Sequence, residues 1–252
     1  MISITNLCTG YSFKEILHQI NLTIPSGKIT VILGPNGCGK STLLKTLCGI
    51  LPIQSGSISF DGQELSTFTP SMLARRVSYL AQSRQVPDIT VLRMVLHGRF
   101  PYLSYPRRYR KEDYRIAEDA MNRMGITELK DTPLSNLSGG TRQKVYIAMA
   151  LAQNTPVILF DEPTTYLDIS HQLQMMDHAR FLSTEGKTVI MVLHDLSMAL
   201  QIADQLVVMN NGTVVGQGTS QEIFDSGCLN QVFDIKLIRI QTKNGWHYYY
   251  ET

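Results

Sequence analysis

One short segment constrains the fold of this chain more than any other, because it combines closely spaced glycines with a lysine and two hydroxyl side chains. It consists of Gly34, Pro35, Asn36, Gly37, Cys38, Gly39, Lys40, Ser41 and Thr42. An apolar run at residues 29–33 precedes it and a helical pattern at residues 41–47 follows. A glycine-rich loop between a strand and a helix turns backbone N–H groups inward, toward phosphate oxygens. The segment therefore predicts a nucleotide-binding loop.

Two side chains of this loop are expected to act directly on the nucleotide. Lys40 supplies a mobile positive charge for the β- and γ-phosphates, and Ser41 supplies a hydroxyl ligand for Mg²⁺. The alternative is a chance match to the pattern. The predicted strand before the loop and the predicted helix after it argue against chance.

A second candidate element is the apolar run at residues 157–160, which leads directly into Asp161 and Glu162. A buried strand of this kind brings both carboxylates to the carboxyl edge of a sheet. We expect Asp161 to hold Mg²⁺ through water and Glu162 to polarise the attacking water. Taken alone, the pair could be an ordinary acidic turn, but a phosphate loop in the same chain favours the catalytic interpretation.

A third element, Leu-Ser-Gly-Gly-Thr-Arg-Gln at residues 137–143, opens the helical run at residues 145–152. Ser138 is a typical N-cap, and Gly139 and Gly140 expose backbone N–H groups at the helix start. The element predicts a second anion site. In isolation these residues could equally be a glycine-rich entry into a helix.

Together the three elements resemble the nucleotide-binding subunits of ABC transporters. The first resembles Walker A, the second Walker B and the third the ABC signature. In that family the signature of one subunit caps the γ-phosphate held by the other, so the resemblance implies a head-to-tail dimer of two copies around two ATP molecules.

The resemblance also implies roles for four residues that would be ordinary surface or strand-end residues if they stood alone. Tyr11 matches the aromatic that stacks on adenine, and Gln82 matches the glutamine that joins a helical subdomain to the magnesium site. Asp168 matches the D-loop aspartate, and His194 the histidine that contacts the γ-phosphate. The implied catalytic set is Glu162, His194, Lys40 and Gln82.

Two positions depart from the commonest family pattern: Thr141 stands where many relatives carry Gln or Glu, and Tyr166 stands where Ser is commoner. The runs TTYLDISHQ and LHGRFPYLSY resemble the branch that serves importers of iron–siderophore, haem and cobalamin complexes. This resemblance implies a separate transmembrane permease, an external substrate-binding protein as an indirect partner, and a location at the cytoplasmic face of the cell membrane.

The pattern along the rest of the chain predicts an α/β fold with a largely parallel sheet. Short apolar runs that alternate with helical patterns lie at residues 29–33, 157–160, 189–193 and 206–209. Antiparallel strands are predicted at residues 2–5, 19–24 and 57–60. We expect one ABC ATPase domain with a core at about 1–89 and 135–233, an inserted helical subdomain at about 90–134, and a C-terminal hairpin at 234–252 that turns at Asn244-Gly245.

Composition narrows the classes of partner. The formal net charge of +2 is too small to indicate a nucleic-acid partner. Charged residues make up 17% of the chain, against about 25% in an average soluble protein, which predicts a contact surface. No run reaches the about 18 apolar residues of a membrane span, and the start of the chain has no signal-peptide pattern. The four cysteines lie apart, as expected in a reducing compartment.

Three other functions stay open. One is a soluble ABC ATPase in a non-transport assembly or a nucleic-acid process, although the paired cassettes or long coiled coil typical of such proteins are not seen. Another is a nucleotide sensor without catalysis, which would be expected to lack one of Lys40, Glu162 or His194. The third is export, although exporter domains are commonly fused to their membrane half.

Overall fold

The computed structural model describes the chain except for residues 13, 82–85, 165–167, 243–244 and 252. Within the described residues the core is a six-stranded sheet in the order β10-β9-β3-β8-β7-β6. Its parallel strands are β3 (Ile29–Leu33), β6 (Val77–Leu80), β7 (Val157–Asp161), β8 (Thr188–Val192) and β9 (Gln205–Asn210). The edge strand β10 (Thr213–Gly218) pairs antiparallel with β9.

Both faces of this sheet are covered, which explains the continuous apolar runs of its inner strands. Every residue of β3, β7 and β8 is buried. Along β7, Ile158 and Phe160 face a core cluster shared with the helices α5 (Gly139–Gln153) and α6 (Ile169–Thr184). Leu159 faces the opposite cluster, which contains the apolar side of the helix α1 (Lys40–Leu47).

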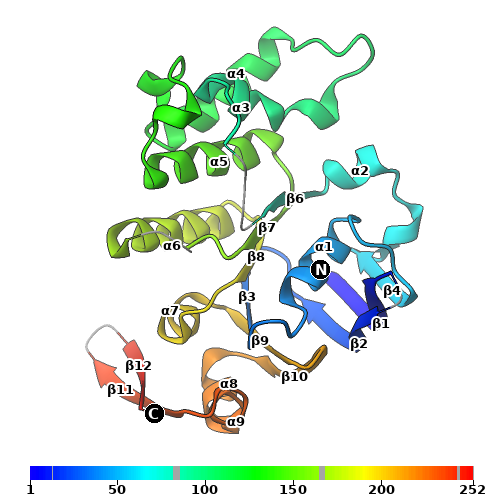
Figure 1. Cartoon of the computed structure of the whole chain (residues 1–252), viewed down its shortest axis with the longest axis vertical. Coiled ribbons are helices and arrows are strands. Elements are labelled where there is room, and N and C mark those ends of the chain that lie inside the picture. Colours follow the sequence, from blue (N-terminus) through cyan, green and yellow to red (C-terminus); the bar gives the residue numbers. More distant parts are fainter. Residues whose placement is uncertain (13, 82–85, 165–167, 243–244, 252) are drawn as a thin grey trace.

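A second sheet packs against α1 from the other side (Figure 1). It has the strand order β2-β1-β4-β5 and is antiparallel. Its strands are β1 (Ile2–Tyr11), β2 (Lys14–Ile24), β4 (Ser55–Phe60) and β5 (Gln63–Glu64). Its buried residues join α1 and the core sheet in one cluster, so the two sheets hold the helix that follows the glycine-rich loop.

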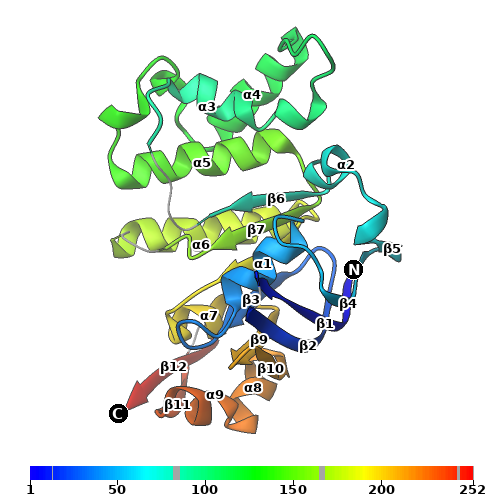
Figure 2. The ribbon, with the colours of Figure 1, turned by 45° about the vertical axis from the view of Figure 1, so that its right-hand side comes forward.

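The helical part stands at one end of the molecule, above the core sheet in Figures 1 and 2. It contains α3 (Val91–His97), α4 (Lys111–Arg123) and α5, which pack on one another. The short elements η2 (Phe100–Tyr102), η3 (Thr127–Leu129) and η4 (Leu134–Asn136) accompany them. Before them in the chain, η1 (Leu65–Thr67) contacts β4, and α2 (Pro70–Ala74) contacts both β6 and η2.

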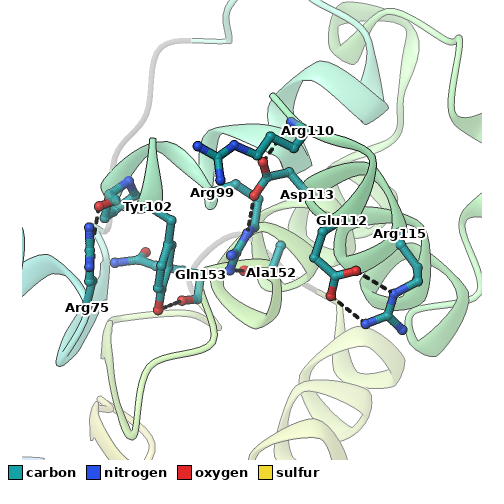
Figure 3. Close-up of polar contacts among 10 residues, drawn as sticks. Arg75, Arg99, Tyr102, Arg110, Glu112, Asp113, Arg115, Ala152 and Gln153 are labelled. Atoms are coloured by element: carbon teal, nitrogen blue, oxygen red, sulfur yellow. Dashed lines mark hydrogen bonds and ion pairs between the residues drawn. The ribbon is translucent and has the colours of Figure 1, made fainter. Parts of the chain in front are cut away.

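Within the helical part, a buried arginine joins the start of α4 to the end of α5 (Figure 3). Arg99 Nε donates to Asp113 Oδ1 at 3.1 Å, and Nη1 donates to the carbonyl of Ala152 at 2.8 Å. The guanidinium also lies 4.0 Å from the centre of the Tyr102 ring, whose hydroxyl donates to the carbonyl of Gln153 at 2.9 Å. These donors satisfy carbonyls that a helix end leaves without intrahelical partners.

The chain ends on the opposite side of the core. The helix α7 (Leu196–Ile202) follows β8, and α8 (Ser220–Ser226) and α9 (Cys228–Phe233) lead into the strands β11 (Lys236–Thr242) and β12 (Gly245–Glu251). These two strands pair antiparallel in register, and Ser197 on α7 donates to the carbonyl of Tyr248 at 2.7 Å. Asn244, the first residue of the predicted turn dipeptide, lies outside the described residues.

The predicted fold class is confirmed: a mainly parallel core sheet, an antiparallel sheet and a helical part are all present. The first strands are longer than predicted, and β6 and β10 were not predicted at all. Across the described ranges, no helix combines the length and apolar character needed to span a membrane.

Candidate functional site

The glycine-rich loop connects β3 to α1 and is shaped by close packing. Gly39 has φ 104°, a left-handed conformation that favours glycine, and a Cβ there would fall 2.5 Å from Leu17 Cδ2. A Cβ on Gly34 would fall 2.3 Å from the carbonyl oxygen of Met209. Gly39 is the N-cap of α1, and no side chain among the described residues caps it. The first N–H groups of α1 are therefore open to an anion.

Lys40 lies inside the curve of the loop. Its ammonium donates to the carbonyls of Gly34 at 2.7 Å and Pro35 at 2.9 Å, and the residue is only 5% exposed. The loop backbone thus holds a positive charge beside the open end of a helix. A polyphosphate is the ligand that such an arrangement fits.

Asp161 ends β7 beside this loop and is 3% exposed. Ser41 Oγ donates to its Oδ1 at 2.9 Å, and the hydroxyl of Tyr79 donates to its Oδ2 at 2.8 Å. A carboxylate and a hydroxyl beside a phosphate site match the oxygen ligands of Mg²⁺, which keeps several waters and completes its shell with substrate phosphates. The residues present therefore fit the expected cation.

Tyr79 is the residue of this site that sequence reasoning missed. It lies on the edge strand β6, opposite Leu159 of β7. Burial raises its pKa, and the hydrogen bond to Asp161 raises it further. The hydroxyl therefore stays protonated and donates to the carboxylate at neutral pH. The sequence marks Tyr79 only as an aromatic residue with a hydroxyl group inside the short, mostly apolar run of β6.

Glu162 and His194 follow the neighbouring strands β7 and β8, and the structure brings them together. Nε2 of His194 lies 2.6 Å from Oε1 of Glu162. The backbone of Glu162 has φ 52°, which is uncommon for a residue with a side chain and is often found at functional sites. The Glu162 side chain is 11% exposed and that of His194 is 45% exposed, so the imidazole is the solvent-facing partner.

Tyr11 lies at the end of β1 and is 43% exposed. Lys45 of α1 donates to its hydroxyl at 3.3 Å, and the Lys45 ammonium is 5.7 Å from the centre of its ring. The ring is therefore tethered to the helix that follows the phosphate loop, with much of its surface open to stacking.

The remaining predicted residues form a separate group. Ser138 caps α5, as predicted, by accepting from the Thr141 N–H at 3.2 Å. Its hydroxyl also lies 2.9 Å from Thr141 Oγ1. Asp168 caps α6 by accepting from the His171 N–H at 2.9 Å. Both residues thus make their hydrogen bonds at the starts of α5 and α6, apart from the phosphate loop.

Gln82 and Tyr166 lie outside the described residues. His171 and His178, which the sequence places seven residues apart, both line a narrow gap between α5 and α6. Across the described part of the chain, no group of three or more His, Cys, Asp and Glu side chains could hold a metal ion.

Comparisons with known proteins agree with this geometry. A family model described as ABC transporter matches residues 17–165. The chain is 41% identical over 236 residues to the iron(3+)-hydroxamate import ATP-binding protein FhuC of Bacillus subtilis, covering 93% of this chain and 88% of the relative. It is 40% identical over 236 residues to the ferric enterobactin transport ATP-binding protein FepC of Escherichia coli, covering 93% and 87%. A solved inward-facing metal-chelate type ABC transporter matches with a TM-score of 0.86 at 28% identity, covering 100% of this chain and 97% of that one.

Proposed function

The chain belongs to the ABC transporter family as an ATP-binding, ABC-type ATPase, and on that premise we propose that it drives import of an iron–siderophore complex through a separate permease. The sequence alone left haem and cobalamin complexes open as cargo. The iron–siderophore class is preferred because the relatives at about 40% identity are named for iron(3+)-hydroxamate and ferric enterobactin. Such a subunit acts at the cytoplasmic face of the cell membrane.

In the proposed mechanism two copies close around two ATP molecules. Lys40 and the open end of α1 bind the phosphates of one copy's ATP, and Ser138 at the start of the other copy's α5 approaches the γ-phosphate. Tyr11 stacks on the adenine, and Asp168 lies where the two copies meet. Ser41, Asp161 and Gln82 would hold Mg²⁺, which when bound would supply positive charge against the phosphate oxygens.

The observation that carries the catalytic assignment is the Glu162–His194 pair. The Glu162 carboxylate accepts a hydrogen bond from the attacking water and orients it, and His194 keeps that carboxylate in place through the contact at 2.6 Å. The same imidazole faces solvent, where the γ-phosphate of bound ATP would lie. Lys40 offsets the charge that develops on the γ-phosphoryl group.

A surface near the helical part supports a permease partner. A groove of about 430 Å³ is lined mainly by apolar residues between Cys48 and Leu73. Ile50, Met72 and Phe100 are exposed apolar residues of the adjoining segments. From sequence we expect the permease contact in a groove lined near residues 99–105. Phe100 and Tyr105 of that segment are exposed, whereas the Arg99 side chain is buried and bound to Asp113 and Ala152.

The test is purification of the Glu162→Gln chain with ATP from detergent-solubilised membranes of its host. We expect a polytopic membrane protein to co-purify at equal stoichiometry, because the variant binds ATP but does not complete hydrolysis. Recovery only with a ribosome or with a non-membrane assembly would overturn the transport proposal and favour the non-transport alternative. Loading the recovered permease with ferric siderophore, haem or cobalamin then identifies the cargo.

A further inference from the structure

His171 has no part in the mechanism above, yet its imidazole lies against the start of α5, the helix that opens with the signature residues. A Cβ placed on Gly140 would fall 2.1 Å from both Cδ2 and Nε2 of His171. The ring therefore occupies the space that any larger side chain at position 140 would need. A Cβ on the neighbouring Gly139 would meet no heavy atom of the described chain within 4 Å. The two adjacent glycines thus differ sharply in what surrounds them.

The ring of His171 is held in this position by Asp168. Nδ1 of His171 lies 2.7 Å from Asp168 Oδ1, and the backbone N–H of His171 donates to the same oxygen at 2.9 Å. A carboxylate only accepts hydrogen bonds, so Nδ1 carries the proton and donates. The backbone contact, followed by the side-chain contact, lowers the pKa of Asp168. Asp168 is therefore charged, and it fixes both the first turn of α6 and the ring.

The ring has little room to move inward. The gap between α5 and α6 behind it is lined by His171, Gln174, Met175 and His178, and it holds about 10 Å³, the space of one water molecule. Met175 is 1% exposed. A side chain added at Gly140 therefore has to push the imidazole away from Asp168, because the ring cannot retreat into the helix interface.

We propose that His171 is a positioning residue that joins the Asp168 cap of α6 to the start of α5, and that its ring excludes any side chain larger than that of glycine at position 140. Ser138 and Asp168 then face a second copy of this chain as one rigid unit. The statement about a second copy rests on the two-copy mechanism proposed above. The proposal about His171 and position 140 concerns the isolated chain alone.

The first experiment measures thermal unfolding of the full chain without nucleotide. Alanine forms helix better than glycine, so propensity alone predicts that Gly139→Ala and Gly140→Ala both raise the unfolding midpoint. We expect Gly140→Ala to lower the midpoint by about 4 °C, because it overpacks the ring. Gly139→Ala is the matched control and should not lower it.

The Gly140→Ala/His171→Asn double variant completes this experiment. Asparagine is shorter than histidine and leaves room for the added methyl group, so we expect the midpoint to recover by at least half of the loss. Equal midpoints for the two alanine variants, or no recovery in the double variant, would overturn the inference.

The second experiment separates the hydrogen bond from the ring. His171→Phe keeps an aromatic ring and loses the Nδ1 donor, whereas His171→Asn keeps an amide donor near the position of Nδ1 and loses the ring. Both are placed in the Glu162→Gln chain, and the ATP concentration for half-maximal dimerisation is measured by light scattering. We expect this ATP concentration to increase about fivefold for His171→Phe and less than about twofold for His171→Asn.

If the His171 ring only fills space, His171→Asn should need the higher ATP concentration for half-maximal dimerisation. Any result other than a larger increase for His171→Phe overturns the positioning role. If Glu162→Gln alone does not dimerise with ATP, the two-copy mechanism fails. The nucleotide-free unfolding measurements still decide whether His171 sets the requirement for glycine at position 140.

Discussion

Replacing Tyr79 with phenylalanine removes one oxygen atom and, with it, one hydrogen bond to the buried carboxylate of Asp161. The hydroxyl donates to Asp161 at 2.8 Å, and Asp161 is 3% exposed. A hydrogen bond to a charged group contributes about 1.5–3 kcal/mol to stability. Because Tyr79 itself is only partly buried, we expect a loss of about 2 kcal/mol at pH 7, which lowers the unfolding midpoint by about 4–8 °C.

Tyr102→Phe is the matched control. The Tyr102 hydroxyl donates at 2.9 Å to the carbonyl of Gln153, an uncharged acceptor (Figure 3). A hydrogen bond between neutral groups contributes about 1 kcal/mol, so this variant should lose about half as much stability. Both losses are measured by urea unfolding of the nucleotide-free chain, and equal losses would contradict the assignment of charge assistance to Tyr79.

The effect of pH gives an independent check on Tyr79. Burial and the bond to Asp161 raise the Tyr79 pKa in the folded chain, whereas an unfolded tyrosine titrates near pH 10. The stability that Tyr79 contributes is therefore complete below about pH 10 and is lost as the pH rises above that value, by about 1.4 kcal/mol per pH unit. We expect the difference in free energy of unfolding between wild type and Tyr79→Phe to be constant from pH 8 to about pH 10 and to narrow from pH 10 to pH 11. A constant or widening gap would refute the reasoning.

Three further predictions concern the phosphate loop and the helical part. Lys40→Ala should weaken ATP binding by at least tenfold in equilibrium titration, because the loop loses its buried positive charge; unchanged affinity would contradict the phosphate loop. Alkylation of Cys38 should abolish ATPase activity and bound ATP should protect the thiol. Burial raises the Cys38 pKa, so alkylation of Cys38, followed by mass spectrometry, should be slower at pH 7 than alkylation of a small-molecule thiol in solution. Full ATPase activity after stoichiometric labelling of Cys38 would contradict this prediction. Arg99→Met should cost about 3–5 kcal/mol in urea unfolding, because it leaves the buried carboxylate of Asp113 without its partner, and a loss below about 1 kcal/mol would contradict that role.

The parts of the fold that sequence reasoning identified are those with strong local patterns. The runs at residues 29–33, 157–160 and 189–193 are buried on both faces, so their apolar character is unbroken and easy to recognise. The strand β6 was missed because it has four residues and contains a serine. Ser78 is accommodated there because its hydroxyl lies 3.1 Å from the hydroxyl of Thr155, a residue far from it in the sequence. Only the folded structure brings that partner to the strand.

The same distinction applies to the site. The glycine-rich loop and the capping serine of α5 are local features, and each forms the local structure that its sequence indicates. Tyr79 and Asp161 are 82 residues apart, and His171 meets Gly140 only where two helices pack. No periodicity or spacing marks such pairs, because tertiary packing creates them. The binding roles of the site residues remain predictions for the experiments above.

The helix α5 gives these local features a mechanical consequence. Its 15 residues form a rod about 22 Å long. Ser138 caps one end of the helix. At the other end Arg99 and Tyr102 donate hydrogen bonds to its last carbonyls, next to the exposed residue Phe100. A rod of this length that pivots by about 10° at one end carries its other end through roughly 4 Å. A small rotation of α5 at the end capped by Ser138 thus becomes a displacement of about one atomic diameter at the end bound by Arg99 and Tyr102.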